Sequence, residues 1–128
     1  MPKHPPFTAH IVKGSGKGSA QGFPTVNLDL TDIPADIGEG IYAGRVAVEG
    51  KIFPAAIHYG ARPVHGLPKS FEAHLLEVSG ISYQVLGTVT VELVERLREV
   101  KNFESEEELK EQIGRDIDRT KEVLNTSC

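Results

Sequence analysis

The sequence predicts a mainly β protein, a small antiparallel barrel that closes on itself and carries one C-terminal α-helix. Three observations support this fold class. Short segments of alternating apolar and polar residues, separated by glycine- and proline-containing turns, fill most of the chain before residue 100. Helical periodicity appears only after Ser105. The strands are too few for a two-sheet sandwich, whereas a closed barrel removes the exposed strand edges.

The expected elements of the N-terminal half are a strand, a connection and a hairpin. Residues 7–13 alternate in polarity and form the first strand, and residues 30–40 are rich in turn formers and connect it onward. Segments 41–48 and 51–58 flank a Glu-Gly turn, which predicts a hairpin. Pro54 indicates an edge strand or a bulge in the second arm, because proline cannot donate to a β-ladder.

A second hairpin is expected further along the chain. Segments 70–78 and 81–97 both have strand-like composition and are separated by the turn residues Ser79 and Gly80. Gly87 is a candidate bulge in the long second arm, because an isolated glycine inside a strand often marks one.

A helix is predicted over residues 105–125. Ser105 and Glu108 form a capping box, in which each side chain can accept a hydrogen bond from the other's backbone N–H. Apolar residues then recur at helical spacing and should pack on the barrel. They are Leu109, Ile113, Ile117 and Leu124.

Length and composition indicate a single domain spanning residues 1–128. The one cysteine, Cys128, has no partner for a disulfide, which favours a reducing, cytoplasmic compartment. No stretch approaches the roughly 20 apolar residues of a membrane span. The formal net charge of -4 argues against nucleic-acid binding and leaves a small anion as the expected ligand. We expect a monomer that contacts neither membrane nor nucleic acid.

The segment 13–28 reads Lys-Gly-Ser-Gly-Lys-Gly-Ser-Ala-Gln-Gly-Phe-Pro-Thr-Val-Asn-Leu and predicts a nucleotide-phosphate site. Gly14, Gly16 and Gly18 allow backbone N–H groups to form a concave cradle for oxyanions, and Lys17 adds positive charge. The spacing matches neither a Walker loop nor a dinucleotide fingerprint. The alternative is an ordinary surface loop before a strand.

Thr25 and Asn27 are candidate metal ligands. If the segment after Pro24 is extended, these two side chains project from the same face. A hydroxyl and an amide carbonyl are hard oxygen ligands of the kind that Mg²⁺ uses when it bridges nucleotide phosphates.

Glu72 is the candidate general base. Alternation in the strand puts Glu72 and His74 on one face and Phe71 on the other. Phosphoryl transfer needs a proton acceptor, a metal and positive charge near the phosphates. The alternative is that Glu72 lies on the solvated face of a half-exposed strand. No role is assigned to His74.

The chain resembles the riboflavin kinase family over nearly its whole length. The most specific motifs are Gly-Phe-Pro-Thr-x-Asn-Leu and Glu-x-His-Leu-Leu, whereas the Ser-x-x-Glu helix start could occur before any helix. Five segments carry the resemblance in the family's order. They are residues 13–28, 40–43, 60–63, 71–76 and 97–105.

The resemblance implies a six-stranded Greek-key barrel and transfer of the γ-phosphoryl group of ATP to the 5'-hydroxyl of riboflavin, giving FMN and ADP. It also implies that Thr25 and Asn27 match the nucleotide and Mg²⁺ motif and that Glu72 matches the catalytic base. Another divalent cation could replace Mg²⁺. Arg98 corresponds to an arginine on the flavin side, where a planar cation could stack on the ring or contact the product phosphate. Its alternative is a surface arginine beside Glu95 and Glu99.

The sequence departs from the family pattern at three places, one of which is a short turn after Val78. Residues 58–64 read His-Tyr-Gly-Ala-Arg-Pro-Val, where bacterial members commonly have Asn-Ile-Gly before Arg-Pro-Thr, and Gln21 replaces the usual leucine. The chain also carries no N-terminal nucleotidyltransferase domain of the kind found in bifunctional enzymes, so FAD synthesis is not expected from it.

Two other functions remain open from the sequence. The barrel could bind flavin or nucleotide without turnover if the changes at 58–64 spoil the site. It could also bind oligonucleotides, as small Greek-key barrels often do. Eight Phe and Tyr residues, no Trp and an excess of acid make this second function less favourable.

Overall fold

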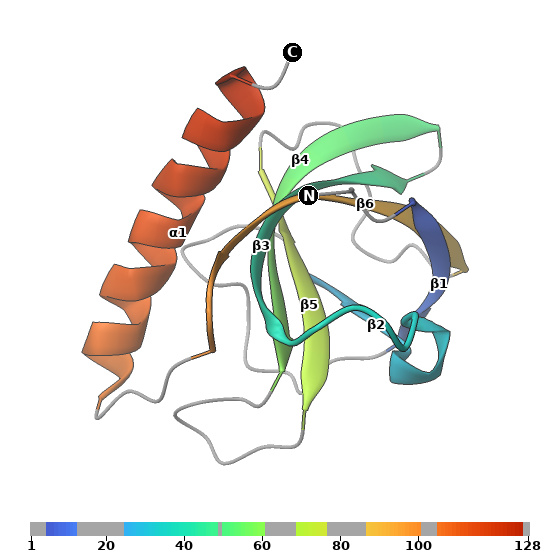
Figure 1. The fold of residues 1–128 in the computed structure, drawn as a ribbon, viewed down its shortest axis with the longest axis horizontal. Coiled ribbons are helices and arrows are strands. Elements are labelled where there is room, and N and C mark those ends of the chain that lie inside the picture. Colours follow the sequence, from blue (N-terminus) through green and yellow to red (C-terminus); the bar gives the residue numbers. More distant parts are fainter. Residues whose placement is uncertain are drawn as a thin grey trace.

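The computed structural model describes residues 5–12, 25–48, 50–60, 69–76, 87–100 and 105–126. Six strands, a short 3-10 helix and one α-helix make up these residues (Figure 1). In chain order they are β1 (Phe7–Val12), β2 (Thr25–Leu28), η2 (Leu30–Asp32), β3 (Gly40–Val48), β4 (Lys51–Gly60), β5 (Ser70–Leu75), β6 (Thr88–Arg98) and α1 (Glu106–Thr126).

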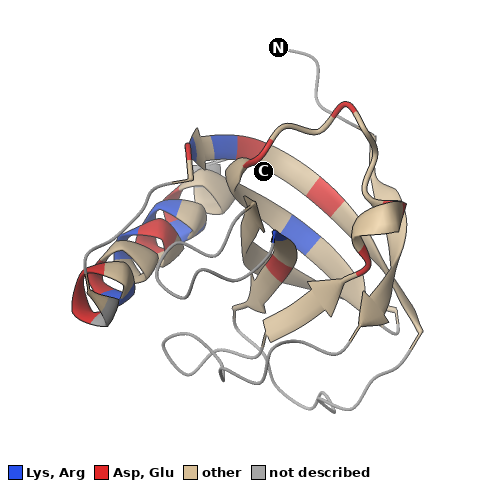
Figure 2. Ribbon diagram, turned by 90° about the horizontal axis from the view of Figure 1, so that it is seen from below, with Lys and Arg blue, Asp and Glu red and all other residues tan. Residues whose placement is uncertain are grey.

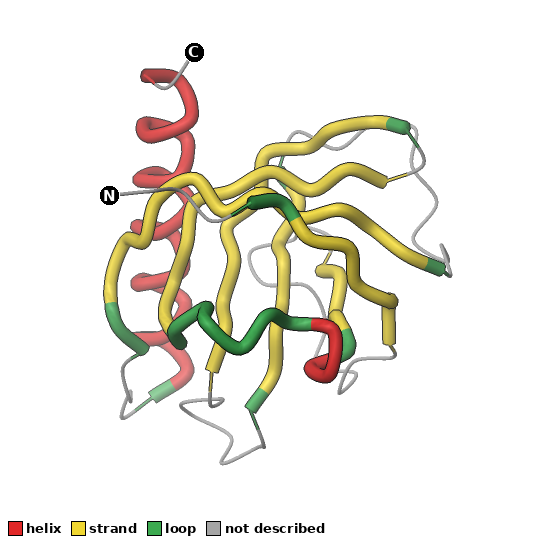
Figure 3. The backbone as a smooth tube through the Cα atoms, turned by 45° about the vertical axis from the view of Figure 1, so that its right-hand side comes forward, coloured by secondary structure: helices red, strands yellow, loops and turns green. Residues whose placement is uncertain are grey.

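The six strands form a closed antiparallel barrel in the order β1-β2-β5-β4-β3-β6. Strands β3, β4 and β5 are consecutive neighbours, and β2 lies beside β5 instead of β3, which is a Greek-key arrangement. Figure 3 shows the strands curving around a common interior, with α1 packed along one side. The prediction of a mainly β barrel with a C-terminal helix is confirmed.

The second predicted hairpin is wrong for the strands that the structure describes. Strand β5 pairs with β2 and β4, while β6 pairs with β1 and β3. Closure of the barrel already gives β5 two neighbours, and a turn signal between two segments does not determine whether they pair. Ser79 and Gly80 lie outside the described residues. Gly87 precedes β6, and the irregularities in that strand's pairing lie opposite residues 41–44.

Pro54 does not make β4 an edge strand, because β4 is paired on both sides. The carbonyl of Pro54 accepts a hydrogen bond of 2.8 Å from the N–H of Leu76. Opposite residues of an antiparallel ladder can exchange two such bonds, but proline has no N–H to return. The β4–β5 ladder accordingly ends next to this proline, with Ala55 opposite Leu75 as its last pair.

The barrel interior is apolar, and alternation decides which side chains enter it. Phe71 lies against Phe7 in an edge-to-face contact of 5.9 Å and against Tyr59 at 5.3 Å. Phe71, Ala73 and Leu75 all belong to this core, so Phe71 faces away from Glu72 and His74 as the alternation predicts. The intervening side chains of β5 consequently point to the outer face of the barrel.

Helix α1 covers part of that outer face. The Ser105 hydroxyl accepts a hydrogen bond of 3.2 Å from the N–H of Glu108, which is one of the two bonds of the predicted capping box. Ile117 is buried with Ala56 and Leu76 in a small second cluster. Charged residues of both signs alternate along the helix (Figure 2). The helix therefore packs one apolar stripe on the barrel and exposes its charged faces.

Candidate active site on strands β2, β4 and β5

The candidate site begins with a row of three side chains on the outer face of the barrel. Asn27 of β2 lies opposite Glu72 of β5, and Glu72 lies opposite His58 of β4. Side chains of directly opposed residues share one face, with Cβ atoms about 5 Å apart. An amide, a carboxylate and an imidazole thus meet across three adjacent strands.

A second row lies two residues further along the same strands. Thr25 of β2 is opposite His74 of β5, and His74 is opposite Ala56 of β4. The Thr25 hydroxyl oxygen and His74 Nδ1 are 2.9 Å apart, a hydrogen-bond distance. The two rows place Thr25, Asn27 and Glu72 within one patch, which is the set of chemical groups that the sequence singled out.

Glu72 is buried, with 8 % of its surface exposed. The alternative of a solvated strand face is wrong for this residue, because the outer face of β5 is covered in the folded protein. The Ser70 hydroxyl donates a hydrogen bond of 2.9 Å to Oε2 of Glu72. A carboxylate offers about four lone-pair positions, so the Ser70 bond still allows a substrate hydroxyl to be accepted. The bond from Ser70 therefore fixes the orientation of the buried Glu72 carboxylate.

The first residues of β5 are held in place by a charged cluster. Lys69 lies 3.2 Å from the Glu39 carboxylate and 4.7 Å from the centre of the Tyr59 ring. The hydrogen bond with Tyr59 and then that with Glu39 raise the pKa of Lys69, so it carries its charge at neutral pH. These contacts fix the start of the strand that carries Ser70 and Glu72.

The oxygen ligands in this patch fit a Mg²⁺ ion. Thr25 and Asn27 are half-buried on one face of β2, between the core and solvent. Within the part of the chain that the structure describes, no three His, Cys, Asp or Glu side chains gather around a common point. Mg²⁺ is usually held by few protein oxygens together with waters and substrate phosphates, so a hydroxyl, an amide and one nearby carboxylate suit it.

The glycine-rich part of the predicted site lies outside the described residues. This applies to Gly14, Gly16, Lys17 and Gly18, and to the departure at Gln21. Of the unusual segment 58–64, His58, Tyr59 and Gly60 end β4, and the remaining residues are also outside.

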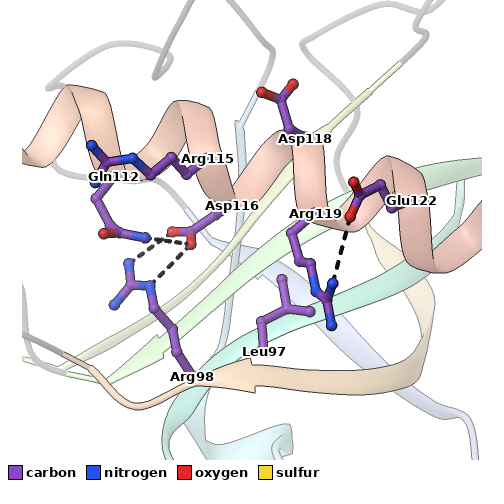
Figure 4. A pocket seen from close by; sticks show the side chains of 8 residues that line it. All are labelled: Leu97, Arg98, Gln112, Arg115, Asp116, Asp118, Arg119 and Glu122. Carbon is purple, nitrogen blue, oxygen red and sulfur yellow. Dashed lines mark hydrogen bonds and ion pairs between the residues drawn. The ribbon is translucent and has the colours of Figure 1, made fainter.

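Arg98 is bound to helix α1. Its Nε and Nη2 donate to the two carboxylate oxygens of Asp116 at 2.9 and 2.7 Å (Figure 4). Its Nη1 donates to the backbone carbonyl of Glu99. Gln112 also donates to Asp116. The Arg98 side chain is only 16 % exposed and is paired with Asp116, so the alternative of a surface arginine is wrong.

The position of Arg98 relative to Glu72 follows from the barrel register. Arg98 lies opposite Ile41 of β3, which lies opposite His58 of β4, which in turn lies opposite Glu72. With strands about 4.8 Å apart, three steps separate Arg98 from Glu72 by about 14 Å along the outer face. Arg98 also borders a hollow of about 400 Å³ between β6 and α1 (Figure 4).

Three residues of this surface were not found from the sequence. Ser70 is two positions before Glu72, so alternation in the strand could have placed both on one face. His58 comes next to Glu72 only through strand pairing, and Asp116 comes next to Arg98 only through helix packing. No local pattern in the sequence indicates their partners.

Comparison with known proteins decides the family of the chain. The family model described as Flavokinase: Riboflavin kinase matches residues 1–124. The chain belongs to the riboflavin kinase family. Thr25, Asn27 and Glu72, the three residues that the sequence singled out, lie on one face of its barrel.

Several curated proteins are similar to this chain over most of its length. Riboflavin kinases from Mus musculus and Homo sapiens are each 34% identical, over 90% and 95% of this chain and 77% and 83% of their own lengths. The bifunctional riboflavin kinase/FMN adenylyltransferase of Haemophilus influenzae is 33% identical over 91% of this chain. The chain spans 37% of that bifunctional protein.

The fold is also found among solved structures. A chain described as a macrolide-efflux protein from Streptococcus pneumoniae superposes with a TM-score of 0.73 and 26% identity, covering 91% of this chain and 38% of the other. The one long helix that the structure describes is not apolar enough to cross a membrane.

Proposed function

We propose that this chain transfers the γ-phosphoryl group of ATP to the 5'-hydroxyl of riboflavin, giving FMN and ADP. The observation that carries the proposal is the buried carboxylate of Glu72 directly opposite Asn27 and one row from Thr25. This places a proton acceptor beside oxygen ligands for a phosphate-bound cation, which phosphoryl transfer requires. Family membership and the two riboflavin kinases that are 34% identical support the choice of substrate.

Glu72 acts as the general base in this proposal. The ribityl 5'-oxygen forms a bond to the γ-phosphorus while the bond from that phosphorus to the β,γ-bridging oxygen breaks. ADP leaves with the bridging oxygen, and the hydroxyl proton passes to Glu72. Ser70 holds the carboxylate in a fixed orientation for this step.

Thr25 and Asn27 would hold the divalent cation, for which Mg²⁺ is our proposal. When bound, the cation would offset negative charge on the phosphates and on the transferred group. Thr25 and Asn27 would orient the nucleotide so that its γ-phosphate faces Glu72. We propose that Gly14, Gly16, Lys17 and Gly18 bind the nucleotide phosphates through backbone N–H groups and one ammonium.

Arg98 is proposed to border the flavin or the product phosphate. Its bidentate contact with Asp116 uses Nε and Nη2 and keeps the guanidinium plane fixed. A ring that stacks on this plane would not have to break the ion pair, so stacking is favoured over direct phosphate binding.

We also propose that the enzyme works as a monomer in the cytoplasm. The lone cysteine leaves no disulfide to form, and the net charge of -4 favours small ligands over nucleic acid. Sedimentation of the purified protein would test the monomer, and imaging of a tagged copy in its own cells would test the compartment.

The function is tested by incubating the purified protein with riboflavin, Mg²⁺ and each nucleoside triphosphate in turn, and separating the products by chromatography. We expect equal amounts of FMN and ADP with ATP. Lumiflavin, which has the ring system without the ribityl chain, is the matched control and should give no phosphorylated product. Flavin or nucleotide binding without FMN formation from any donor would instead identify a binding protein.

A further inference from the structure

We propose that His74 is a positioning residue for the cation site, because its Nδ1 accepts the hydrogen bond of the Thr25 hydroxyl and so turns the lone pairs of that oxygen toward the metal. The inference rests on the proposed function, in which Thr25 is a cation ligand. The sequence pattern alone assigned no role to His74.

The geometry of the pair supports this assignment. Thr25 and His74 are directly opposite in the β2–β5 ladder, and Thr25 Oγ1 lies 2.9 Å from His74 Nδ1. His74 is buried, with 8 % of its surface exposed, whereas Thr25 is half-buried. A buried imidazole therefore contacts the hydroxyl of a residue that is itself partly exposed.

The direction of the hydrogen bond determines how many lone pairs Thr25 can offer to a cation. A hydroxyl has one donor hydrogen and two acceptor lone pairs. If Nδ1 of neutral His74 accepts the hydrogen, both lone pairs of Thr25 point away from the ring and one can face a metal. If Nδ1 carries a hydrogen and donates it, the ring occupies a lone pair and the hydroxyl hydrogen must point elsewhere. The first arrangement leaves both lone pairs of the oxygen for a ligand, whereas the second leaves one.

Residues behind a metal ligand commonly fix its orientation, and their loss usually weakens metal binding about 10- to 100-fold. A purely structural role for the same bond would join β2 to β5 without preference for its direction. The positioning role requires one tautomer of His74 and predicts weaker cation binding when His74 is substituted, whereas the structural role requires neither. A lower stability of the variant is compatible with both roles.

The tautomer can be measured in the unmodified protein. Two-dimensional ¹⁵N–¹H NMR of the histidine rings at neutral pH distinguishes a bare Nδ1 from a protonated one. We expect His74 to have a bare Nδ1 and a hydrogen on Nε2. A hydrogen on Nδ1 would overturn the proposal without bearing on whether the protein phosphorylates riboflavin.

Cation binding provides the second test, with Mn²⁺ and the non-hydrolysable analogue β,γ-methylene-ATP as probes in calorimetry. His74→Leu should weaken binding about 10- to 100-fold. His74→Asn should keep affinity within about threefold, because the Asn oxygen can take the place of Nδ1 as acceptor. His10→Asn is the matched control, since His10 is exposed on β1 and bonded to Asp32.

A double substitution separates action through Thr25 from a general disturbance. In a Thr25→Val background, His74→Leu should cause little further loss of Mn²⁺-analogue affinity, because the hydroxyl that it positions is already absent. Equal affinity of wild type and His74→Leu, or an undiminished loss in the Thr25→Val background, would overturn the proposal. A wild type that binds the analogue equally well with and without Mn²⁺ would overturn the cation site itself, and this inference with it.

Discussion

Asn27 of β2 and Glu72 of β5 lie directly opposite each other in the antiparallel ladder and share the outer face of the barrel. A single strand pair therefore brings the segment that follows the glycine-rich loop next to the candidate base, although the two residues are far apart in the chain. The outer location separates the chemistry from the apolar interior, which keeps its own packing. Substitutions at the site should therefore affect catalysis more than folding.

Removing the proposed cation ligands should change metal dependence. We expect Thr25→Ala or Asn27→Ala to raise the KM for the Mg²⁺-nucleotide about 10-fold or more, since each loses a contact with a charged group. Thr90→Ala is a matched control, because Thr90 is an exposed threonine on β6 that lies near Thr8. Titrating Mg²⁺ at fixed ATP measures the effect, and an unchanged Mg²⁺ dependence would remove both residues from the cation site.

The ion pair between Arg98 and Asp116 should be important for stability. Both side chains are largely buried, at 16 % and 10 % exposed, so Asp116→Ala leaves an unpaired, poorly solvated guanidinium. We expect the free energy of unfolding to fall by about 3 kcal/mol. Arg119→Ala removes an ion-pairing side chain that is 60 % exposed and should cost less than about 1 kcal/mol. Urea unfolding of the two variants would contradict this account if their losses were equal.

Gly44 is needed for the close approach of β3 to β6. A Cβ at this position would lie 2.4 Å from the Glu92 carbonyl oxygen and 2.8 Å from Cδ1 of Ile57. Gly44→Ala should therefore destabilise the protein by about 1–3 kcal/mol. Gly114→Ala is its control, because a Cβ in that part of α1 meets nothing within 4 Å and should stabilise the helix by about 0.5–1 kcal/mol. Thermal unfolding should move Tm in opposite directions, and a shared direction would count against the packing argument.

The contact between Asp32 and His10 should make stability depend on pH in the acid range. The backbone N–H of His10 donates to the Asp32 carboxylate, and with the bond from the imidazole it lowers the pKa of Asp32 below its ordinary value of 3.8. A lowered folded-state pKa gives stability that is present above the unfolded value and is lost as the pH falls through the folded value.

The Asp32→Asn variant measures this contribution. We expect wild type to be more stable than the variant near neutral pH and the difference to shrink as the pH falls below about 3.8. Urea unfolding at a series of pH values provides the measurement. A difference that stays constant down to the lowest pH at which both proteins fold would show that Asp32 is not the titrating group.

The strands and the helix could be predicted from local pattern. Alternation placed Phe71 in the core, and the capping box of Ser105 placed the start of α1 to within a residue. The partners of β5 could not be predicted this way, because they depend on closure of the whole barrel. The turn signal at 79–80 indicated a β5–β6 hairpin that the closed order excludes.

The residues of the candidate site could be predicted from the sequence, but their burial and their contacts could not. Glu72 was found through its motif, but alternation alone would have left it on a solvated face, whereas it is buried. The contacts of Thr25 with His74 and of Arg98 with Asp116 join elements distant in sequence. Such contacts leave no periodic signal, because each depends on how the elements pack in three dimensions.

The most direct test of the central claim is a single-turnover measurement of FMN formation by wild type and by Glu72→Gln, with riboflavin and Mg²⁺-ATP bound. Glutamine keeps the size of the side chain and can still accept a hydrogen bond from Ser70, but it cannot take up the hydroxyl proton. We predict that Glu72→Gln binds both substrates nearly as well as wild type and forms FMN about 10²-fold more slowly or worse. Equal rates of FMN formation in the two proteins would contradict the assignment of Glu72 as the base.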